Sequence, residues 1–427
     1  MAGPNAPGVL SVSHRIRAAV AVGVVGALVS ACGGVADQPS ASPTVAAGAA
    51  SGCASTLNVG APYPLSGGLA EFGKNSLQGM QEAVDEINAA GGIKALNGAK
   101  LKVVPADTGS SDASQAATVT TKLITDDKVI AIVGAWLSNL TITASTSAEE
   151  GRVPMLTQSW ADQITGRGYH YIFQPPPRSS AFGDFTVQGY LGAAKAAGIP
   201  VTRVAAVGPN DVANVGQITA AVKAFRTAGV TAGDPDFYQA GLTDASAIAN
   251  RIADQKPDLV LASGSPSDAV LIVKAIRARG VKAPIVGFGG GFVAISLGQA
   301  LGSAVDGIIA ASAWNDDLPL PNVSATSTAY MKKFSAPFMP MEAGESWVAV
   351  YVLKDAMEKA ATCVPQKIRD TLAGIDVTSG PGSSMPGGKV SFDATGNNPN
   401  VTPILIEWEG GRPVTIWPSK YAKAPLK

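Results

Sequence analysis

Short apolar runs alternate with helix-like segments along most of this chain, and this alternation restricts the fold more than any other feature. The run Val129–Gly134 is apolar throughout, as expected for a strand buried on both faces of a parallel sheet. One predicted helix places four apolar residues on a single face, at spacings of three and four: Leu77, Met80, Val84 and Ile87. Strands and helices that alternate in this way predict a doubly wound α/β fold.

The same alternation starts a second time after Pro175-Pro176-Pro177 and continues to about residue 313. Beyond residue 326, three predicted helices follow one another with no strand between them. Three short predicted strands close the chain, and the last two flank Gly410-Gly411, a hairpin signal. The sequence therefore predicts two α/β lobes, and the surplus helices indicate that the chain crosses between the lobes more than once.

The charge balance argues against a nucleic-acid partner, because 32 Lys and Arg residues face 32 Asp and Glu residues. Two His and three Cys residues leave little material for a His/Cys metal centre, so we expect no metal and no cofactor. No G-x-S-x-G, H-E-x-x-H, C-x-x-C or Walker-type phosphate loop is found. His170 is more consistent with a surface or packed residue than with a catalytic base. We therefore expect no enzymatic activity.

The N-terminus has the pattern of an export signal. Arg15 and Arg17 precede the apolar run 18–31, which is shorter than the ~20 residues that a membrane-spanning helix needs. The run ends in Val29-Ser30-Ala31-Cys32, which resembles a bacterial lipobox. We expect a lipoprotein signal peptide at 1–31, lipid attachment to Cys32, and a flexible Ser/Ala/Gly/Pro-rich tether at 32–55. An ordinary secretory signal or a short anchor is the alternative.

Cys53 and Cys363 remain after the signal segment and Cys32 are set aside. An exported chain permits a disulfide, and two is an even number of cysteines. A Cys53–Cys363 disulfide is the prediction, and two unpaired thiols are the alternative.

In open α/β sheets, ligands bind beyond the carboxyl ends of the strands. The loops at these ends carry aromatic, Ser and Asn side chains, no Lys or Arg, and a few acids that include Asp211. An anionic ligand usually needs an Arg fork, so the loops favour a neutral or zwitterionic small molecule with an apolar part. The predicted ligand-binding residues are Phe72, Trp136, Ser138, Asn139, Gln158, Ser159, Trp160, Asp211, Ser265 and Phe288.

Several motifs in order resemble the periplasmic leucine/isoleucine/valine-binding protein family. The opening stretch 58–93 contains Pro64-Leu65-Ser66-Gly67 and a long helix that ends DEINAAGGI. Gly151-x-Val153-Pro154-Met155 follows, and Val390-Ser391-Phe392-Asp393-x-x-Gly396-Asn397-Asn398 closes the series. The resemblance covers roughly residues 57–418.

This resemblance implies a type I periplasmic-binding-protein fold, in which two doubly wound α/β lobes are joined by three crossings. Lobe one would comprise 56–175 and 315–389, and lobe two 176–314 and 390–427. The resemblance also places Cys53 and Cys363 together at the end of lobe one away from the cleft.

Residue by residue, Phe72 matches an aromatic at the cleft mouth and Ser138 matches a Ser that holds a ligand carboxylate. Ser159, or a neighbour of it, matches a segment that binds carboxylate and ammonium. This sequence departs from the family at Ser265, where amino-acid binders often carry Tyr. It departs again at Phe288–Gly291, which lacks the acid that faces the ammonium group. Asp211 is a possible substitute.

The family implies an extracytoplasmic receptor that captures a small neutral or zwitterionic solute, such as a branched-chain amino acid or an amide. It would deliver this solute to the permease and ATPase subunits of an ABC importer, and the lipid on Cys32 would hold it at the outer face of the cytoplasmic membrane. A ligand sensor of the same fold, acting in regulation, is the alternative.

Overall fold

The computed structural model describes residues 52–239 and 241–427. The predicted signal peptide, Cys32 and most of the predicted tether lie outside these residues. The chain first forms a parallel sheet in the order β2-β1-β3-β4-β5. Its strands are β1 (Thr56–Tyr63), β2 (Lys100–Asp107), β3 (Ala131–Val133), β4 (Met155–Leu156) and β5 (Ile172–Phe173). We call the layers around this sheet lobe one.

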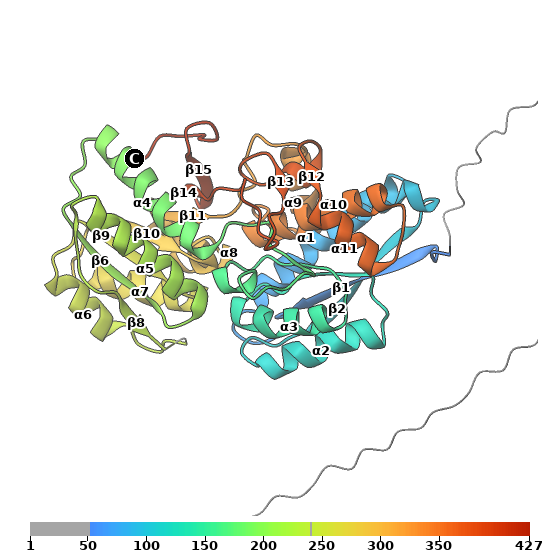
Figure 1. The fold of residues 1–427 in the computed structure, drawn as a ribbon. Helices are drawn as coiled ribbons and strands as arrows, with labels where there is room; N and C mark the ends of the chain where they lie inside the picture. Colours follow the sequence, from blue (N-terminus) through green and yellow to red (C-terminus); the bar gives the residue numbers. More distant parts are fainter. Residues whose placement is uncertain (1–51, 240) are drawn as a thin grey trace, which may run out of the picture. The chain divides into compact units, whose positions relative to one another are not determined.

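Helices cover both faces of the lobe-one sheet (Figure 1). The helices between its strands are α1 (Ala70–Ala89), α2 (Ala113–Thr125) and α3 (Ser138–Glu150), with the 3-10 turns η1 (Lys94–Leu96) and η2 (Asp162–Ile164). One face packs on α2 and α3 through a cluster that includes Leu123, Ile132 and Ala144. The apolar stripe predicted for 77–87 falls on α1, where Met80, Val84 and Ile87 are buried.

The second sheet has the order β15-β14-β11-β10-β9-β6-β7, with β8 paired to β6, and we call the layers around it lobe two. Its strands from β6 to β11 pair in parallel. Strand β14 is antiparallel to β11, and β15 is antiparallel to β14. The strands are β6 (Arg203–Pro209), β7 (Thr231–Ala232), β8 (Asp236–Tyr238), β9 (Leu259–Ser263), β10 (Ile285–Phe288), β11 (Ile309–Ser312), β14 (Ile404–Glu409) and β15 (Arg412–Trp417). The helices are α4 (Ser179–Ala196), α5 (Val212–Thr227), α6 (Ser246–Asp254), α7 (Pro266–Ala278) and α8 (Ile295–Leu301), with η3 (Gly290–Phe292) and η4 (Gly302–Val305).

Between the two parts of lobe two, the chain returns to lobe one, so that it passes between the lobes three times within the described residues. The returning segment contains α9 (Val323–Phe334), α10 (Met341–Ala360), α11 (Pro365–Ala373), β12 (Asp376–Val377), η5 (Pro381–Ser383) and β13 (Val390–Ser391). Helix α10 lies along α1, as the orange and blue helices of Figure 1 show. The backbones approach so closely that a Cβ at Gly79 would lie 2.0 Å from the carbonyl oxygen of Ala343.

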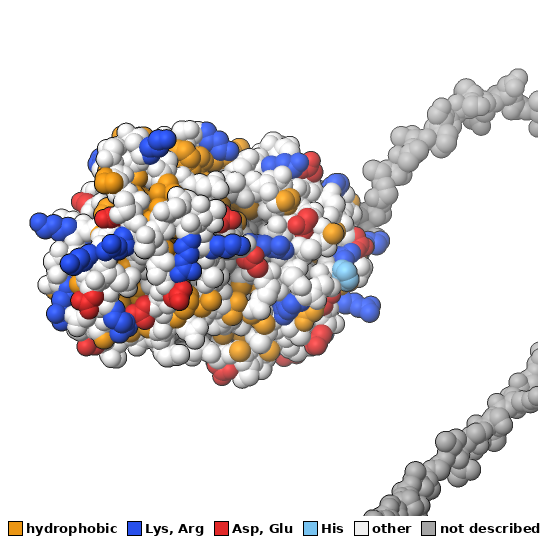
Figure 2. Space-filling view, turned by 60° about the vertical axis from the view of Figure 1, so that its left-hand side comes forward, with side chains coloured by type: hydrophobic (Ala, Val, Ile, Leu, Met, Phe, Trp, Pro, Cys, Tyr) orange, Lys and Arg blue, Asp and Glu red, His pale blue; other side chains and the backbone are white. Residues whose placement is uncertain are grey.

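The prediction of two doubly wound α/β lobes with three crossings is confirmed. The structure adds a detail at the last crossing, because β13 pairs with β12 in a small separate sheet rather than with lobe two. The chain joins the lobe-two sheet again only at β14. On the face shown in Figure 2, acidic and basic side chains are interspersed.

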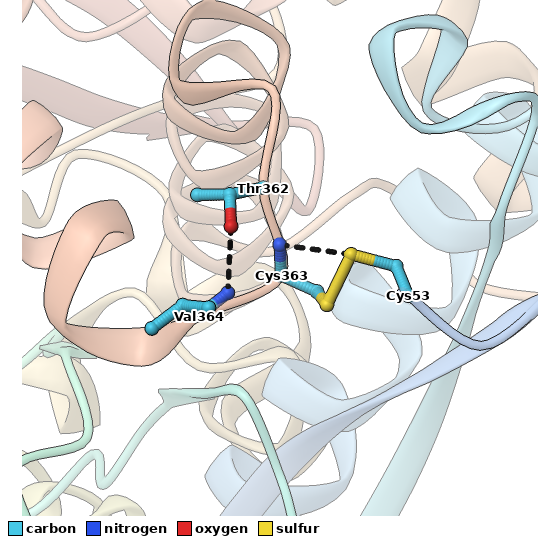
Figure 3. Close-up of a disulfide and its surroundings, with 4 residues drawn as sticks. All are labelled: Cys53, Thr362, Cys363 and Val364. Atoms are coloured by element: carbon cyan, nitrogen blue, oxygen red, sulfur yellow. Dashed lines mark hydrogen bonds between the residues drawn. A yellow bond between two sulfur atoms is a disulfide. The ribbon is translucent and has the colours of Figure 1, made fainter. Parts of the chain in front are cut away.

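The structure joins Cys53 to Cys363 by a disulfide, with 5.8 Å between the two Cα atoms, so the predicted pairing is confirmed (Figure 3). Cys53 lies just before β1 and Cys363 just after α10. The backbone N–H of Cys363 also donates to Sγ of Cys53 at 3.1 Å. The bond therefore links the start of the lobe-one sheet to the end of the returning helix.

We predict that Cys363→Ser lowers the free energy of unfolding by about 2–4 kcal/mol, because it removes a constraint on a very long loop of the unfolded chain. Chemical denaturation of the wild type and the variant measures this difference. In the unfolded, unreduced wild type, iodoacetamide should label neither Cys53 nor Cys363, and reduction should expose both. Labelling of both residues before reduction would contradict the disulfide.

Candidate functional site

A cavity of about 480 Å³ lies where the carboxyl ends of strands from both lobes face each other. Lobe one contributes the loops that follow β1, β2, β3 and β4, and lobe two contributes those after β6, β9 and β10. This is the position at which doubly wound sheets bind ligands. A second cavity, of about 680 Å³, lies near Pro284 and Gly307, just before β10 and β11, and is therefore at the amino ends of those strands.

Two aromatic stacks form the apolar walls of the cavity. Phe72 and Trp136 stack with centroids 4.1 Å apart and planes 13° apart. Trp160 stacks on Phe182 of α4, with ring centroids 4.5 Å apart. Gly290 of lobe two lies against the first stack, where an added Cβ would be 2.7 Å from Trp136 and 2.9 Å from Phe72. Only a residue without a side chain fits there, so the stack closes one edge of the cavity against lobe two.

A second contact between the lobes lies next to this stack. The backbone N–H of Ser296, in α8, donates to a carboxylate oxygen of Glu71, in the first turn of α1, at 3.1 Å. The Ser296 hydroxyl donates to the other carboxylate oxygen of Glu71. These bonds connect lobe one to lobe two directly beside the cavity.

The amino end of α3 supplies unpaired polar groups on the lobe-one side. Ser138 and Asn139 start the helix, and the residue before it, Leu137, provides no side-chain cap. The first-turn N–H groups and the helix dipole make such an end favourable for an anionic group. The Ser138 hydroxyl accepts from the N–H of Ala161 at 3.3 Å, which ties this end to the loop after β4.

Lobe two places acids on the opposite side. Asp211 caps α5 by accepting from the N–H groups of Ala213 and Asn214 at 3.1 and 3.0 Å. Asp268, in α7, is buried and accepts from the N–H of Leu242 at 2.9 Å. Among the described residues that line the cavity, these two Asp residues are the charged ones. A negative lobe-two wall and a helix amino end on lobe one suit a neutral or zwitterionic ligand.

Two glutamine side chains in the lining have amide atoms that lack a hydrogen-bond partner within the described part of the chain. Gln158 uses its Nε2 to donate to the carbonyl oxygen of Glu342 at 2.6 Å and to Ser346 at 2.7 Å, but its Oε1 is unpartnered. Gln217, in α5, is fully buried and has neither a donor nor an acceptor partner. A buried polar group that lacks a partner costs about 1–3 kcal/mol.

The structure places eight of the ten sequence-predicted residues on the cavity lining: Phe72, Trp136, Ser138, Asn139, Gln158, Trp160, Asp211 and Ser265. Ser159 lies off the lining, since its hydroxyl donates to the carbonyl oxygens of Ala135 and Trp136 at 3.0 and 2.8 Å. Phe288 is the last residue of β10, and its side chain is buried in the core. Ser265 has a structural task as well, because it caps α7.

Sequence reasoning missed four lining residues with polar side chains that lie outside the loops it pointed to: Ser110, Ser111, Gln217 and Asp268. Ser110 and Ser111 follow β2, so the strand-end rule was sufficient to find them. Gln217 and Asp268 lie inside helices, and no local pattern indicates which helix face meets a cleft.

Behind the cavity, α10 carries two fully buried acids. Burial raises the pKa of Glu342 to about 8, although Asn75 donates a hydrogen bond to it at 2.9 Å. Burial also raises the pKa of Glu345 well above its usual value, and the indole N–H of Trp160 donates to it at 3.1 Å. Glu342 is therefore mostly neutral around pH 7, and burial disfavours the charged form of Glu345 in the same way, which keeps net charge away from the inner wall.

Both acids retain their protons in the folded protein at pH values where the unfolded chain has released them. Through Glu342, the free energy of unfolding should therefore fall as the pH rises from about 4.5 toward 8, by up to about 1.4 kcal/mol per pH unit, and Glu345 acts in the same direction. Glu342→Gln, which keeps a carbonyl oxygen for Asn75, should flatten this slope. Urea denaturation at pH 5, 6.5 and 8 measures it, with the exposed Glu150→Gln as control. An unchanged slope in Glu342→Gln would contradict the assignment.

The described residues contain no group of three or more His, Cys, Asp or Glu side chains that is placed to hold a metal ion. Over the same ranges, none of the helices has both the length and the apolar character needed to span a bilayer.

Two α/β lobes with a ligand-sized cavity between them are the architecture of the type I periplasmic-binding-protein fold. Residues 56–412 match the family model described as periplasmic binding protein, and the chain belongs to that family. Its curated relatives include "Leu/Ile/Val-binding protein homolog 8" of Brucella abortus, which is 26% identical over 380 residues, covering 87% of this chain and 93% of the relative.

Solved structures show the same architecture. One is the branched-chain amino acid transporter substrate binding protein LivJ of Streptococcus pneumoniae in complex with isoleucine. It has a TM-score of 0.70 and 26% identity, and the match covers 84% of this chain and 99% of LivJ. A leucine binding protein of Thermotoga maritima has a TM-score of 0.72 and 22% identity, with 84% and 98% covered, and shows the likeness of fold alone.

Proposed function

We propose that this protein is a solute-binding lipoprotein that captures a small neutral or zwitterionic solute between its lobes and delivers it to the permease and ATPase subunits of an ABC importer. The observation that carries this proposal is the cavity of about 480 Å³, which both lobes line at the carboxyl ends of their strands. A volume of this size holds an amino acid or a comparable small molecule.

The proposed ligand lies with its polar end at the start of α3 and its apolar body against the aromatic stacks. A carboxylate would accept hydrogen bonds from the first-turn N–H groups beside Ser138. A cationic or hydrogen-donating group would face Asp211 or Asp268 on lobe two. The relative LivJ holds isoleucine, a zwitterion with an apolar side chain, which is the same combination.

Binding in such a cleft requires the lobes to open and close. We assign residues 56–175 with 315–391 to lobe one, and residues 176–314 with the C-terminal segment that contains β14 and β15 to lobe two. The last boundary lies beyond β13 because β13 pairs with β12. The contacts of Glu71 with Ser296 and of Gly290 with Trp136 would form as the lobes close on the solute.

We predict that leucine, isoleucine, valine or a small amide raises the melting temperature of the full-length protein, and that Trp136→Ala weakens the affinity at least tenfold. The affinity should fall because the substitution removes one apolar wall of the cavity. A tenfold weaker affinity corresponds to a loss of about 1.4 kcal/mol in binding free energy. Thermal shift and isothermal titration measure the two effects. Phe334→Ala, in the tilted Tyr330–Phe334 pair of α9, is the matched control. Equal loss of affinity in both variants would place the site elsewhere.

We also propose that Cys32 becomes the lipid-carrying N-terminal residue and anchors the protein at the outer face of the cytoplasmic membrane. Two or more acyl chains at one residue are sufficient for stable attachment. Globomycin should block removal of residues 1–31, and Cys32→Ser should move the protein from the membrane fraction to the soluble fraction. Membrane retention of the Cys32→Ser variant would argue for an uncleaved anchor instead.

A further inference from the structure

The inner part of the cavity contains polar groups for which the protein itself supplies no partner. They are Oε1 of Gln158, from the loop after β4, and both amide atoms of Gln217, from α5. Gln158 is 1% exposed and Gln217 is 0% exposed, so bulk water does not solvate either side chain. Because buried polar groups are nearly always paired in native proteins, such a set indicates a ligand that completes the bonds.

The packing around Gln217 explains why no neighbour pairs with it. Helices α4 and α5 lie in close contact here, since an added Cβ on Gly216 would be 3.3 Å from Cβ of Ser179, and one on Gly183 would be 2.4 Å from Cβ of Ala220. The hydroxyl of Ser179 also lacks a partner within the described chain. The α4–α5 interface therefore holds Gln217 in place at the cavity without satisfying its amide.

Gln158 is fixed from the opposite lobe in a defined orientation. Its Nε2 donates both to the carbonyl oxygen of Glu342 and to Ser346, which are residues of α10. With the nitrogen held by two acceptors, the free atom of Gln158 is an acceptor oxygen. The two glutamines together present two acceptor oxygens and one donor nitrogen.

We propose that this pair recognises a neutral terminal carboxamide or ureido group, so that the solute of this protein belongs to the amide class; the inference rests on the proposed function. A primary carboxamide offers two N–H donors and one carbonyl acceptor, which complements two acceptor oxygens and one donor nitrogen. An aliphatic end would leave all three protein groups unpaired.

The charges near the site decide against ionised alternatives. Asp211, which caps α5, and Asp268, in α7, are the acids of the described lining, and no Lys or Arg of the described chain is in it. A carboxylate at the two glutamines, away from the amino end of α3, would have no cation to pair with and a high desolvation cost. An ammonium group would leave the Gln217 nitrogen without an acceptor. A neutral group that both donates and accepts satisfies every atom.

Matched ligands test the proposal on the full-length wild type. One set is L-glutamine, L-glutamate and L-methionine, which differ at the terminal group; the other is butyramide and butyrate; L-isoleucine is the reference apolar zwitterion. Isothermal titration should show, in at least one of the two sets, that the carboxamide binds at least tenfold more tightly than its matched acid. If that set is the first, L-glutamine should also bind at least tenfold more tightly than L-methionine and L-isoleucine.

The variant Gln217→Met, similar in size and apolar, should lose ten- to hundredfold in carboxamide affinity while its affinity for methionine or isoleucine is unchanged or higher. Without ligand it should melt no lower than the wild type, because a buried unpaired amide has been removed. Gln217→Glu, which lacks the donor, is the second variant if Gln217→Met does not fold. Gln188→Met, on the exposed face of α4, is the matched control and should behave as the wild type.

The outcomes separate the two proposals. If isoleucine or methionine binds the wild type as tightly as any carboxamide, the amide assignment is wrong and the solute-binding function stands. If the preference for carboxamides survives in both Gln217 variants, Gln158 and Gln217 are not the site of recognition, and their amide atoms are paired by water only. If no compound of the panel binds, both the amide assignment and the proposed solute class are overturned.

Discussion

The close packing of α10 against α1 is the contact on which lobe one and its half of the cleft depend. Helix α10 begins some 250 residues after α1 in the chain, and it lies flat against α1 only because Gly79 admits the backbone of Ala343. Its first two turns then reach the loop after β4. There Glu342 and Ser346 fix Gln158, and Glu345 accepts from Trp160. One helix–helix contact therefore supports the fold and orients two lining residues.

The two walls of the cleft have different characters for a physical reason. Lobe one presents a helix amino end and aromatic rings, whereas lobe two presents two acids, Asp211 as the cap of α5 and Asp268 in the first turn of α7. Burial disfavours the charged forms of Glu342 and Glu345 in α10, because it raises the pKa values of both carboxyl groups. The cleft can therefore favour neutral or zwitterionic solutes without a single basic residue in its described lining.

Much of the site could be predicted because parallel strands gather the residues after them at one edge. Trp136 and Ser138 follow β3, and Phe72 follows the loop after β1, so their positions are a consequence of the strand order. The choice between Ser159 and its neighbours could not be made in the same way. These residues lie in the loop after β4, where no strand alternation fixes their direction. The structure places Gln158 and Trp160 on the cavity lining, while the Ser159 hydroxyl donates to backbone carbonyls.

By itself, the sequence determined the fold class and the loops that meet at the cleft. These follow from local periodicity and from rules of chain order. Only the tertiary structure decided which polar atoms remain unpaired in the cleft, among them the amide of Gln217. Whether a buried group finds a partner depends on packing between helices such as α4 and α5, or α1 and α10. That packing joins residues far apart in the chain, and no local pattern encodes it.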